Sequence, residues 1–197
     1  MQLLSNFLNG NNIMRIIKAF LFGAVGLFII ITLFSLIIPS TVKVSRTVLI
    51  NNTQPGIVHY LISNFGNWSE WHPIFKSQTT KTHNIDQYTF AVEYNNKQTE
   101  IIFTSQDSNF VKFTLRSQGE NDIENEIFIT SIPSQSNEPV DSFNFNKNSN
   151  VQVNWVAVNK LKWYPWEKFY GIFIDKLTGP GYEAALNGLK TFVEEGK

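Results

Sequence analysis

Few residues in this sequence could perform acid–base, nucleophilic or metal chemistry. The three histidines are His59, His72 and His83, and none of them has the spacing of a zinc motif such as H-E-x-x-H. No serine lies in a G-x-S-x-G elbow, and no glycine-rich phosphate loop is present. His72 stands apart because Trp71 and Pro73 flank it in a short aromatic segment. We therefore predict no metal, no cofactor and no catalytic residue, and we keep His72 as a candidate ligand contact.

The composition excludes further kinds of chemistry. The 197 residues contain no cysteine, so thiolate nucleophiles, iron–sulfur clusters, cysteine-based zinc sites and disulfide scaffolds are ruled out. Sixteen Lys and Arg residues balance sixteen Asp and Glu residues, whereas a protein that neutralises nucleic-acid phosphates normally carries a basic excess. We therefore expect no nucleic-acid partner. The 17 Phe residues and the moderate charge exclude wholesale disorder.

A membrane anchor is predicted near the N-terminus. The stretch that begins at Ala19 and ends at Ile38 is almost entirely apolar, and twenty helical residues span about 30 Å, the thickness of a bilayer's hydrocarbon core. The absence of a polar stripe argues against a buried core helix. The length of the run and the lack of a small-x-small site argue against a cleaved signal peptide. We predict a transmembrane helix over residues 14–40, ended by Pro39, and a disordered extension over residues 1–13.

Basic residues lie on both sides of this segment. Arg15 and Lys18 precede it, and Lys43 and Arg46 follow it, so the positive-inside rule gives nearly a tie. A single N-terminal anchor before a long domain usually keeps its short basic end in the cytoplasm. We therefore expect a single-pass protein whose domain of residues 41–197 lies on the non-cytoplasmic side.

The hydrophobic pattern of residues 41–155 predicts mainly antiparallel strands. Alternating apolar residues favour strands near residues 42–50, 88–94, 101–103, 111–115, 127–129 and 151–155. Helical spacing predicts a helix from Thr53 to Asn64, with Thr53 as its N-cap, and residues 67–73 leave room for one helical turn. Residues 134–150 are rich in Ser and Asn and predict a long loop.

A long helix follows the last strand. Apolar residues recur at i, i+3, i+4, i+7, i+8 and i+11 from Trp166 to Leu177, resume after Gly179-Pro180-Gly181, and continue to Glu195. We expect residues 178–181 to interrupt this helix, with Pro180 either in the first turn of a second segment or at a kink. The resulting fold class is α+β: an antiparallel, curved sheet of about seven strands wraps around a long C-terminal helix, preceded by one transmembrane helix. The sheet and the helix could leave a cavity between them.

Several segments resemble one known family. Residues 44–51 (V-S-R-T-V-L-I-N) resemble its opening strand, residues 67–73 (N-W-S-E-W-H-P) resemble its w-x-x-W-x-P motif, residues 153–155 (V-N-W) its V-x-W, and residues 173–190 its closing helix. The family is the SRPBCC superfamily, also called START-like or helix-grip, and the resemblance is to its polyketide cyclase/dehydrase-type branch. It covers residues 41–197 and implies the helix-grip fold, and many members of this branch carry an N-terminal membrane helix.

The resemblance and the apolar composition together suggest three functions. The first is a membrane-tethered domain that binds a hydrophobic small molecule or a lipid without catalysis. The second is an enzyme of the cyclase/dehydrase type, although no acid–base pair is visible. The third is a non-catalytic interaction module of the stress or co-chaperone type, with a cavity filled by its own side chains. The residues that we expect to line the cavity are Trp68, Trp71, His72, Phe75, Trp155, Phe169 and Phe173.

Overall fold

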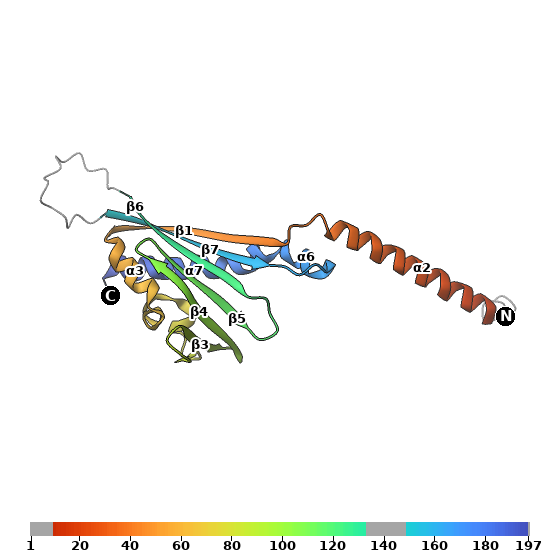
Figure 1. Ribbon diagram of the computed structural model, residues 1–197, viewed down its shortest axis with the longest axis horizontal. Helices are drawn as coiled ribbons and strands as arrows, with labels where there is room; N and C mark the ends of the chain where they lie inside the picture. Colours follow the sequence, from red (N-terminus) through yellow and green to blue (C-terminus); the bar gives the residue numbers. More distant parts are fainter. Residues whose placement is uncertain (1–9, 133–148, 197) are drawn as a thin grey trace, which may run out of the picture. The chain divides into compact units, whose positions relative to one another are not determined.

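The computed structural model describes residues 10–132 and 149–196 (Figure 1). Contacts group the chain into two compact units. The N-terminal unit contains the helix α2 (Gly10–Ser35), the linker up to Ser40 and the segment Lys162–Gly171. The sheet unit contains Thr41–Leu161 and the chain from Ile172 onward. The inclusion of Lys162–Gly171 in the N-terminal unit is a feature that the sequence pattern did not indicate.

The helix α2 is the one described helix that is long and apolar enough to cross a membrane, judged by length and composition, over Ile13–Ser35. None of its most apolar part is buried in the described structure. The helix includes residues 10–13, which we expected to be disordered; their polar Asn residues extend an apolar helix rather than interrupt it. The remainder of that predicted extension, residues 1–9, lies outside the described residues.

The helix α2 ends before the predicted Ile38. The amides of Ile37 and Ile38 donate to the carbonyls of Phe34 and Ser35, three residues back, which is the tighter geometry of a closing helical turn. Pro39 accounts for this ending, because its ring disfavours helical backbone at the residue before it.

The sheet unit contains a seven-stranded antiparallel sheet in the order β1-β7-β6-β5-β4-β3-β2. The helix α7 runs along one face of this sheet (Figure 1). The predicted helix-grip fold is therefore confirmed. The strands are β1 (Thr41–Thr53), β2 (Lys81–Asn84), β3 (Thr89–Tyr94), β4 (Lys97–Asp107), β5 (Phe110–Ser117), β6 (Ile123–Ile132) and β7 (Ser149–Lys160).

The strand β7 shows why the alternating pattern was informative. Val151, Val153, Trp155 and Ala157 are all buried, because alternate side chains of a strand point to the same face. The strand starts at Ser149, so residues 149–150 are paired with neighbouring strands instead of forming loop, and the rest of the predicted loop lies outside the described residues. The exposed edge strand β2 escaped prediction because it has no buried face and therefore no alternation.

Short helices connect β1 to β2. They are α3 (Pro55–Ser63), η1 (Phe65–Asn67), α4 (Trp68–Trp71) and α5 (Pro73–Lys76). The helix α3 starts later than expected: Gln54 occupies the N-cap position, and the predicted cap, Thr53, is the buried last residue of β1. The β-branched Thr53 continues the strand because its partner Ser149 extends the ladder to that point.

The C-terminal helical region differs from prediction in the position of its break. The helix α6 (Pro165–Gly171) ends first, Phe173 caps the next helix, and α7 (Ile174–Glu195) continues through Pro180. A proline inside a helix costs about 3 kcal/mol. Burial of Ala185, Leu186 and Leu189 on α7 offsets this cost. Pro180 has no N–H for the carbonyl of Lys176, but both residues are exposed, so water can bond to that carbonyl. The predicted interruption at residues 178–181 is therefore wrong.

The predicted core face of this region is also wrong in its first part. Five residues of the expected apolar stripe are exposed, namely Trp166, Phe169, Tyr170, Phe173 and Leu177, and the sixth, Ile174, is buried. The core of the sheet unit is formed instead by the inward rows of β3 to β7, by α3 and α4, and by the later turns of α7.

Candidate ligand-binding site

A cavity of about 340 Å³ lies in the sheet unit between the sheet, α4–α5 and α7. Its floor is formed by buried apolar side chains, and its rim contains exposed residues. The lining residues are Trp68, His72, Ile74, Phe75, Val92, Tyr94, Lys97, Thr99, Ile101, Phe113, Leu115, Trp155, Thr178, Gly181 and Tyr182.

Two tryptophans hold the α4 segment against α3. The indole nitrogen of Trp68 donates to the carbonyl of Ile62 at 2.9 Å, and that of Trp71 donates to Leu61 at 3.2 Å. Both carbonyls lie in the last turn of α3, where backbone acceptors lack helical partners. The segment therefore satisfies the end of α3 and places the ring of Trp68 in the cavity.

A third tryptophan comes from the sheet. The indole nitrogen of Trp155 donates to Oδ1 of Asn125 at 2.9 Å, and Nδ2 of Asn125 donates to the carbonyl of Ile123. Asn125 is buried, and it is a partner of the candidate site that the sequence did not predict. Its signal was a polar residue in the inward row of β6 between Ile123 and Ile127. The cavity tryptophans Trp68 and Trp155 thus offer a ligand only apolar ring surfaces.

His72 is held in an aromatic cluster at the cavity wall. Its ring stacks on Trp68 at 5.3 Å with an angle of 8°, and it meets the ring of Phe75 at 5.0 Å. Burial lowers the pKa of His72 to about 4, so the imidazole is neutral at pH 7. Its Nδ1 accepts a hydrogen bond from the amide of Ile74 at 3.3 Å. A neutral ring that accepts at Nδ1 carries its proton on Nε2.

The Nε2–H group of His72 is therefore a donor, and the hydrogen bond at Nδ1 is the one that the His72 side chain forms with the described residues. Tyr182 brings a hydroxyl group to the same lining, and its ring contacts Trp155 at 5.2 Å. Burial raises the pKa of Tyr182 to about 12, so it also stays neutral. Thr99 and Thr178, in contrast, are engaged by Ser117 and by the carbonyl of Ile174.

The rim of the cavity is formed by the β3–β4 hairpin. Its turn residues Asn95 and Asn96 both have positive φ values, 50° and 61°, as a two-residue type I′ turn requires. Tyr94 and Lys97 therefore lie opposite each other at the hairpin end. Lys97 is paired with Glu120 at 2.6 Å, so its charge is already compensated at the rim.

Four of the seven predicted lining residues line this cavity: Trp68, His72, Phe75 and Trp155. Trp71 is buried beside it but faces α3 and α7. Phe169 lies exposed on α6, and Phe173 lies exposed at the start of α7, so neither belongs to the lining. These three residues therefore do not line this cavity, and for Phe169 and Phe173 the helical spacing identified an apolar face without identifying what the face contacts.

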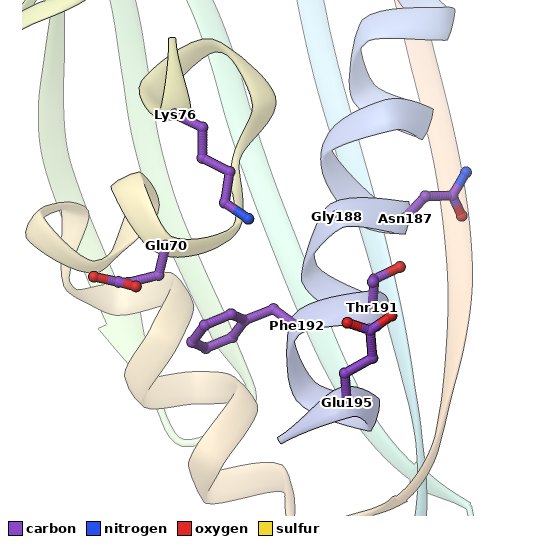
Figure 2. Close-up of a pocket in the computed structure, with 7 residues that line it drawn as sticks. All are labelled: Glu70, Lys76, Asn187, Gly188, Thr191, Phe192 and Glu195. Atoms are coloured by element: carbon purple, nitrogen blue, oxygen red, sulfur yellow. The ribbon is translucent and has the colours of Figure 1, made fainter. Parts of the chain in front are cut away.

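A second concavity of about 480 Å³ lies between α4–α5 and α7 (Figure 2). Its lining includes the exposed charged side chains of Glu70, Lys76 and Glu195, which water already solvates. It lacks the buried apolar floor of the aromatic cavity, so we assign the candidate site to the aromatic cavity. Across the described residues, no group of three His, Cys, Asp or Glu side chains could hold a metal ion.

No family model and no curated protein matches the sequence. Solved structures share its fold at low identity. The di-domain ARO/CYC protein StfQ from the steffimycin biosynthetic pathway has a TM-score of 0.52 and 9% identity, over 79% of this chain and 51% of StfQ. Protein TTHA0849 from Thermus thermophilus has a TM-score of 0.51 and 13% identity, over 79% and 99% of the two chains.

A third similar structure is SA2116 from Staphylococcus aureus, a protein of unknown function. It has a TM-score of 0.51 and 13% identity, over 79% of this chain and 96% of SA2116. The fold of the sheet unit is thus that of polyketide cyclase-type and uncharacterised helix-grip proteins. At such low identity the comparisons establish the fold alone.

Proposed function

We propose that this chain is a membrane-tethered, SRPBCC-type domain that binds a hydrophobic small molecule or a lipid in the aromatic cavity without catalysing a reaction. The supporting observation is the cavity itself, whose buried floor is aromatic and aliphatic and whose tryptophan N–H groups are already satisfied within the protein. A site of this kind gains affinity from apolar contact.

The size and polarity of the cavity narrow the ligand class. Its volume of about 340 Å³ lies near the lower end of the usual range for small-molecule sites, which favours a compact molecule or part of a lipid chain. Lys97 is the one formally charged residue among its described lining residues, and it is paired with Glu120. The free Nε2–H of His72 would suit a ligand that carries one hydrogen-bond acceptor, such as a carbonyl or a hydroxyl oxygen.

The helix α2 supports the membrane-tethered part of the proposal. It is exposed along its apolar length and is long enough to span a bilayer. A domain tethered in this way would meet apolar ligands where they are concentrated, and the tether would keep the cavity close to its source of ligand.

An enzyme of the cyclase/dehydrase type is the second candidate, because His72 and Tyr182 share the cavity and both contact Trp155. The pKa values weigh against it. A histidine with a pKa of about 4 is a weak base at pH 7, and a tyrosine with a pKa of about 12 is a weak acid. The interaction-module hypothesis is disfavoured by the open volume, which the protein's side chains leave unfilled.

Native mass spectrometry of the full chain, purified in detergent, tests the binding proposal. We expect a bound molecule that survives detergent release and that organic extraction identifies. Leu115→Trp should remove it, because Leu115 lines the cavity and the larger ring would fill the space. Leu49→Trp is the matched control, because Leu49 is exposed on β1 and the same ring there leaves the cavity open.

Retention of the molecule in Leu115→Trp would place it elsewhere on the chain, for example along α2, and would contradict the cavity as the site. A wild-type chain that takes up nothing from a panel of fatty acids, phospholipids and aromatic polyketones would contradict binding altogether. Near-ultraviolet circular dichroism checks that both variants keep the packed tryptophans of the wild type.

A further inference from the structure

The short helix α6 buries a lysine and exposes its aromatic residues, the opposite of the usual arrangement. Pro165, Lys168 and Gly171, at i, i+3 and i+6, are buried, whereas Trp166, Phe169 and Tyr170 are exposed. A surface helix of a water-soluble domain normally buries its aromatic residues and exposes its lysines. The outer surface of α6 is therefore mainly aromatic, with the half-buried Glu167 beside it, and water alone is an unfavourable environment for these rings.

The buried lysine explains how α6 is held in this orientation. Lys168 is 4% exposed, and its Nζ donates to the carbonyl of Ile38 at 3.0 Å and to the hydroxyl of Ser40. These acceptors follow the last turn of α2, where the unpaired carbonyls of a helix carry partial negative charge and favour a cation. Ser35, the last residue of α2, is fully buried, whereas most of the helix from residue 13 onward is exposed. The charge of Lys168 thus fastens α6 to the end of α2.

The exposed side of α6 continues into the residues before it. Trp163 is 71% exposed and Trp166 is 64% exposed, with Tyr164 stacked on Trp166 at 4.6 Å. Lys162 lies over the ring of Tyr164 at 5.9 Å. We call the residues Trp163, Trp166, Phe169 and Tyr170 the aromatic patch. Tryptophan and tyrosine beside lysine are the residues that membrane proteins concentrate at the level of the lipid headgroups.

We propose that the aromatic patch inserts into the headgroup region of the bilayer that α2 spans, so that α6 lies in the membrane surface. This inference rests on the proposed membrane anchor and adds a second point of attachment. We choose the bilayer as the partner of the patch because of where α6 lies. The helix α2 would leave the hydrocarbon layer at Ser35, five residues before Ser40. Lys168 holds α6 at this same end of α2 through its bond to Ile38. The exposed Leu36 and Ile37 of the linker belong to the same apolar zone.

Tryptophan fluorescence can test this inference directly. The five tryptophans divide into Trp68, Trp71 and Trp155, which are at most 3% exposed, and the two of the aromatic patch. We would reconstitute the full chain in phosphatidylcholine vesicles with brominated acyl chains, which quench indoles that reach the bilayer. The wild type should be quenched, and the double variant Trp163→Phe/Trp166→Phe should show quenching about threefold smaller, because its remaining indoles are inside the protein.

Acrylamide, a quencher confined to water, provides the opposite readout. The two patch tryptophans should be shielded from it in vesicles and exposed to it in urea. Patch tryptophans that acrylamide quenches and brominated lipid does not would overturn the inference. Flotation of the vesicles separates this result from failure of the anchor. A chain that floats with the vesicles but has unquenched tryptophans would support the anchor and contradict insertion of the aromatic patch. A chain that does not float would contradict both.

Discussion

At the scale of single residues, the site is defined by which polar atoms already have partners. The indole nitrogens of Trp68 and Trp155 are engaged by Ile62 and Asn125, so these rings present only carbon to the cavity. His72 differs, because one nitrogen accepts from the amide of Ile74 and the other is left as a donor. A single donor in an apolar lining gives orientation to a ligand without adding charge.

The buried His72 makes the stability of the protein depend on pH. Its pKa is about 4 in the folded chain and 6.5 when unfolded, so only the unfolded chain takes up the proton between these values. Stability is therefore fully retained above about pH 6.5 and decreases by about 3 kcal/mol as the pH falls to 4. Urea unfolding of the full chain in detergent, followed by tryptophan fluorescence, measures this dependence.

The variant His72→Gln should flatten that pH dependence, because glutamine does not titrate. His83→Gln is the control, since His83 is exposed on the edge strand β2 and should leave the pH dependence as it is in the wild type. An unchanged slope in His72→Gln would assign the effect to other groups.

At the scale of elements, the position of α7 depends on close approach of backbones. A Cβ atom on Gly188 would overlap with the carbonyl oxygen of Trp71, so glycine lets α7 touch α4 directly. Gly179 makes room in the same way for the guanidinium of Arg46, which forms two hydrogen bonds with Asp175. These contacts bring Tyr182 of α7 and Trp68 of α4 to one cavity.

Gly188→Ala should destabilise the protein by about 1–3 kcal/mol, because the backbone of Trp71 cannot move aside as a flexible side chain could. Gly181→Ala, in the same helix, meets nothing within 4 Å and should stabilise by up to about 1 kcal/mol through helix propensity. Thermal unfolding of the two variants provides the comparison. Equal changes in stability for the two variants would contradict the inference that α7 needs a glycine at its contact with α4.

At the scale of the whole molecule, the chain returns to its N-terminal unit after completing the sheet. Lys162–Gly171 belongs with α2, and the hydrogen bonds from Lys168 to Ile38 and Ser40 join segments about 130 residues apart in the sequence. The proposed anchor α2 and the helix α6 are therefore parts of one compact unit.

We accordingly expect the full chain, expressed in a bacterial host, to retain α2 and to resist alkaline carbonate extraction from membranes. Intact mass of the purified protein checks retention of α2, and a chain lacking residues 1–35 is the control that should leave the pellet. A mature protein that begins after Ser35 and appears in the soluble fraction would contradict the anchor.

The sequence by itself determined the features that depend on local periodicity. The apolar run of α2, the alternation of β7 and the aromatic segment around Trp68 each predicted their element, because burial of one face leaves a repeating pattern in the chain. Four cavity residues followed from these elements and from the resemblance to a known fold. Periodicity alone could not place Pro180 within a helix, since that depends on tertiary packing that offsets a local cost.

The tertiary structure alone decided what each apolar face contacts. Most of the stripe from Trp166 to Leu177 is exposed although it has the spacing of a core helix. On α6 the buried residue is Lys168, which bonds to the carbonyl of Ile38, and the aromatic residues face outward. Asn125 and Tyr182 joined the site through strand pairing and helix packing across long sequence separations. A hydrogen bond between distant residues leaves no periodic trace in a single sequence, so only the folded chain reveals it.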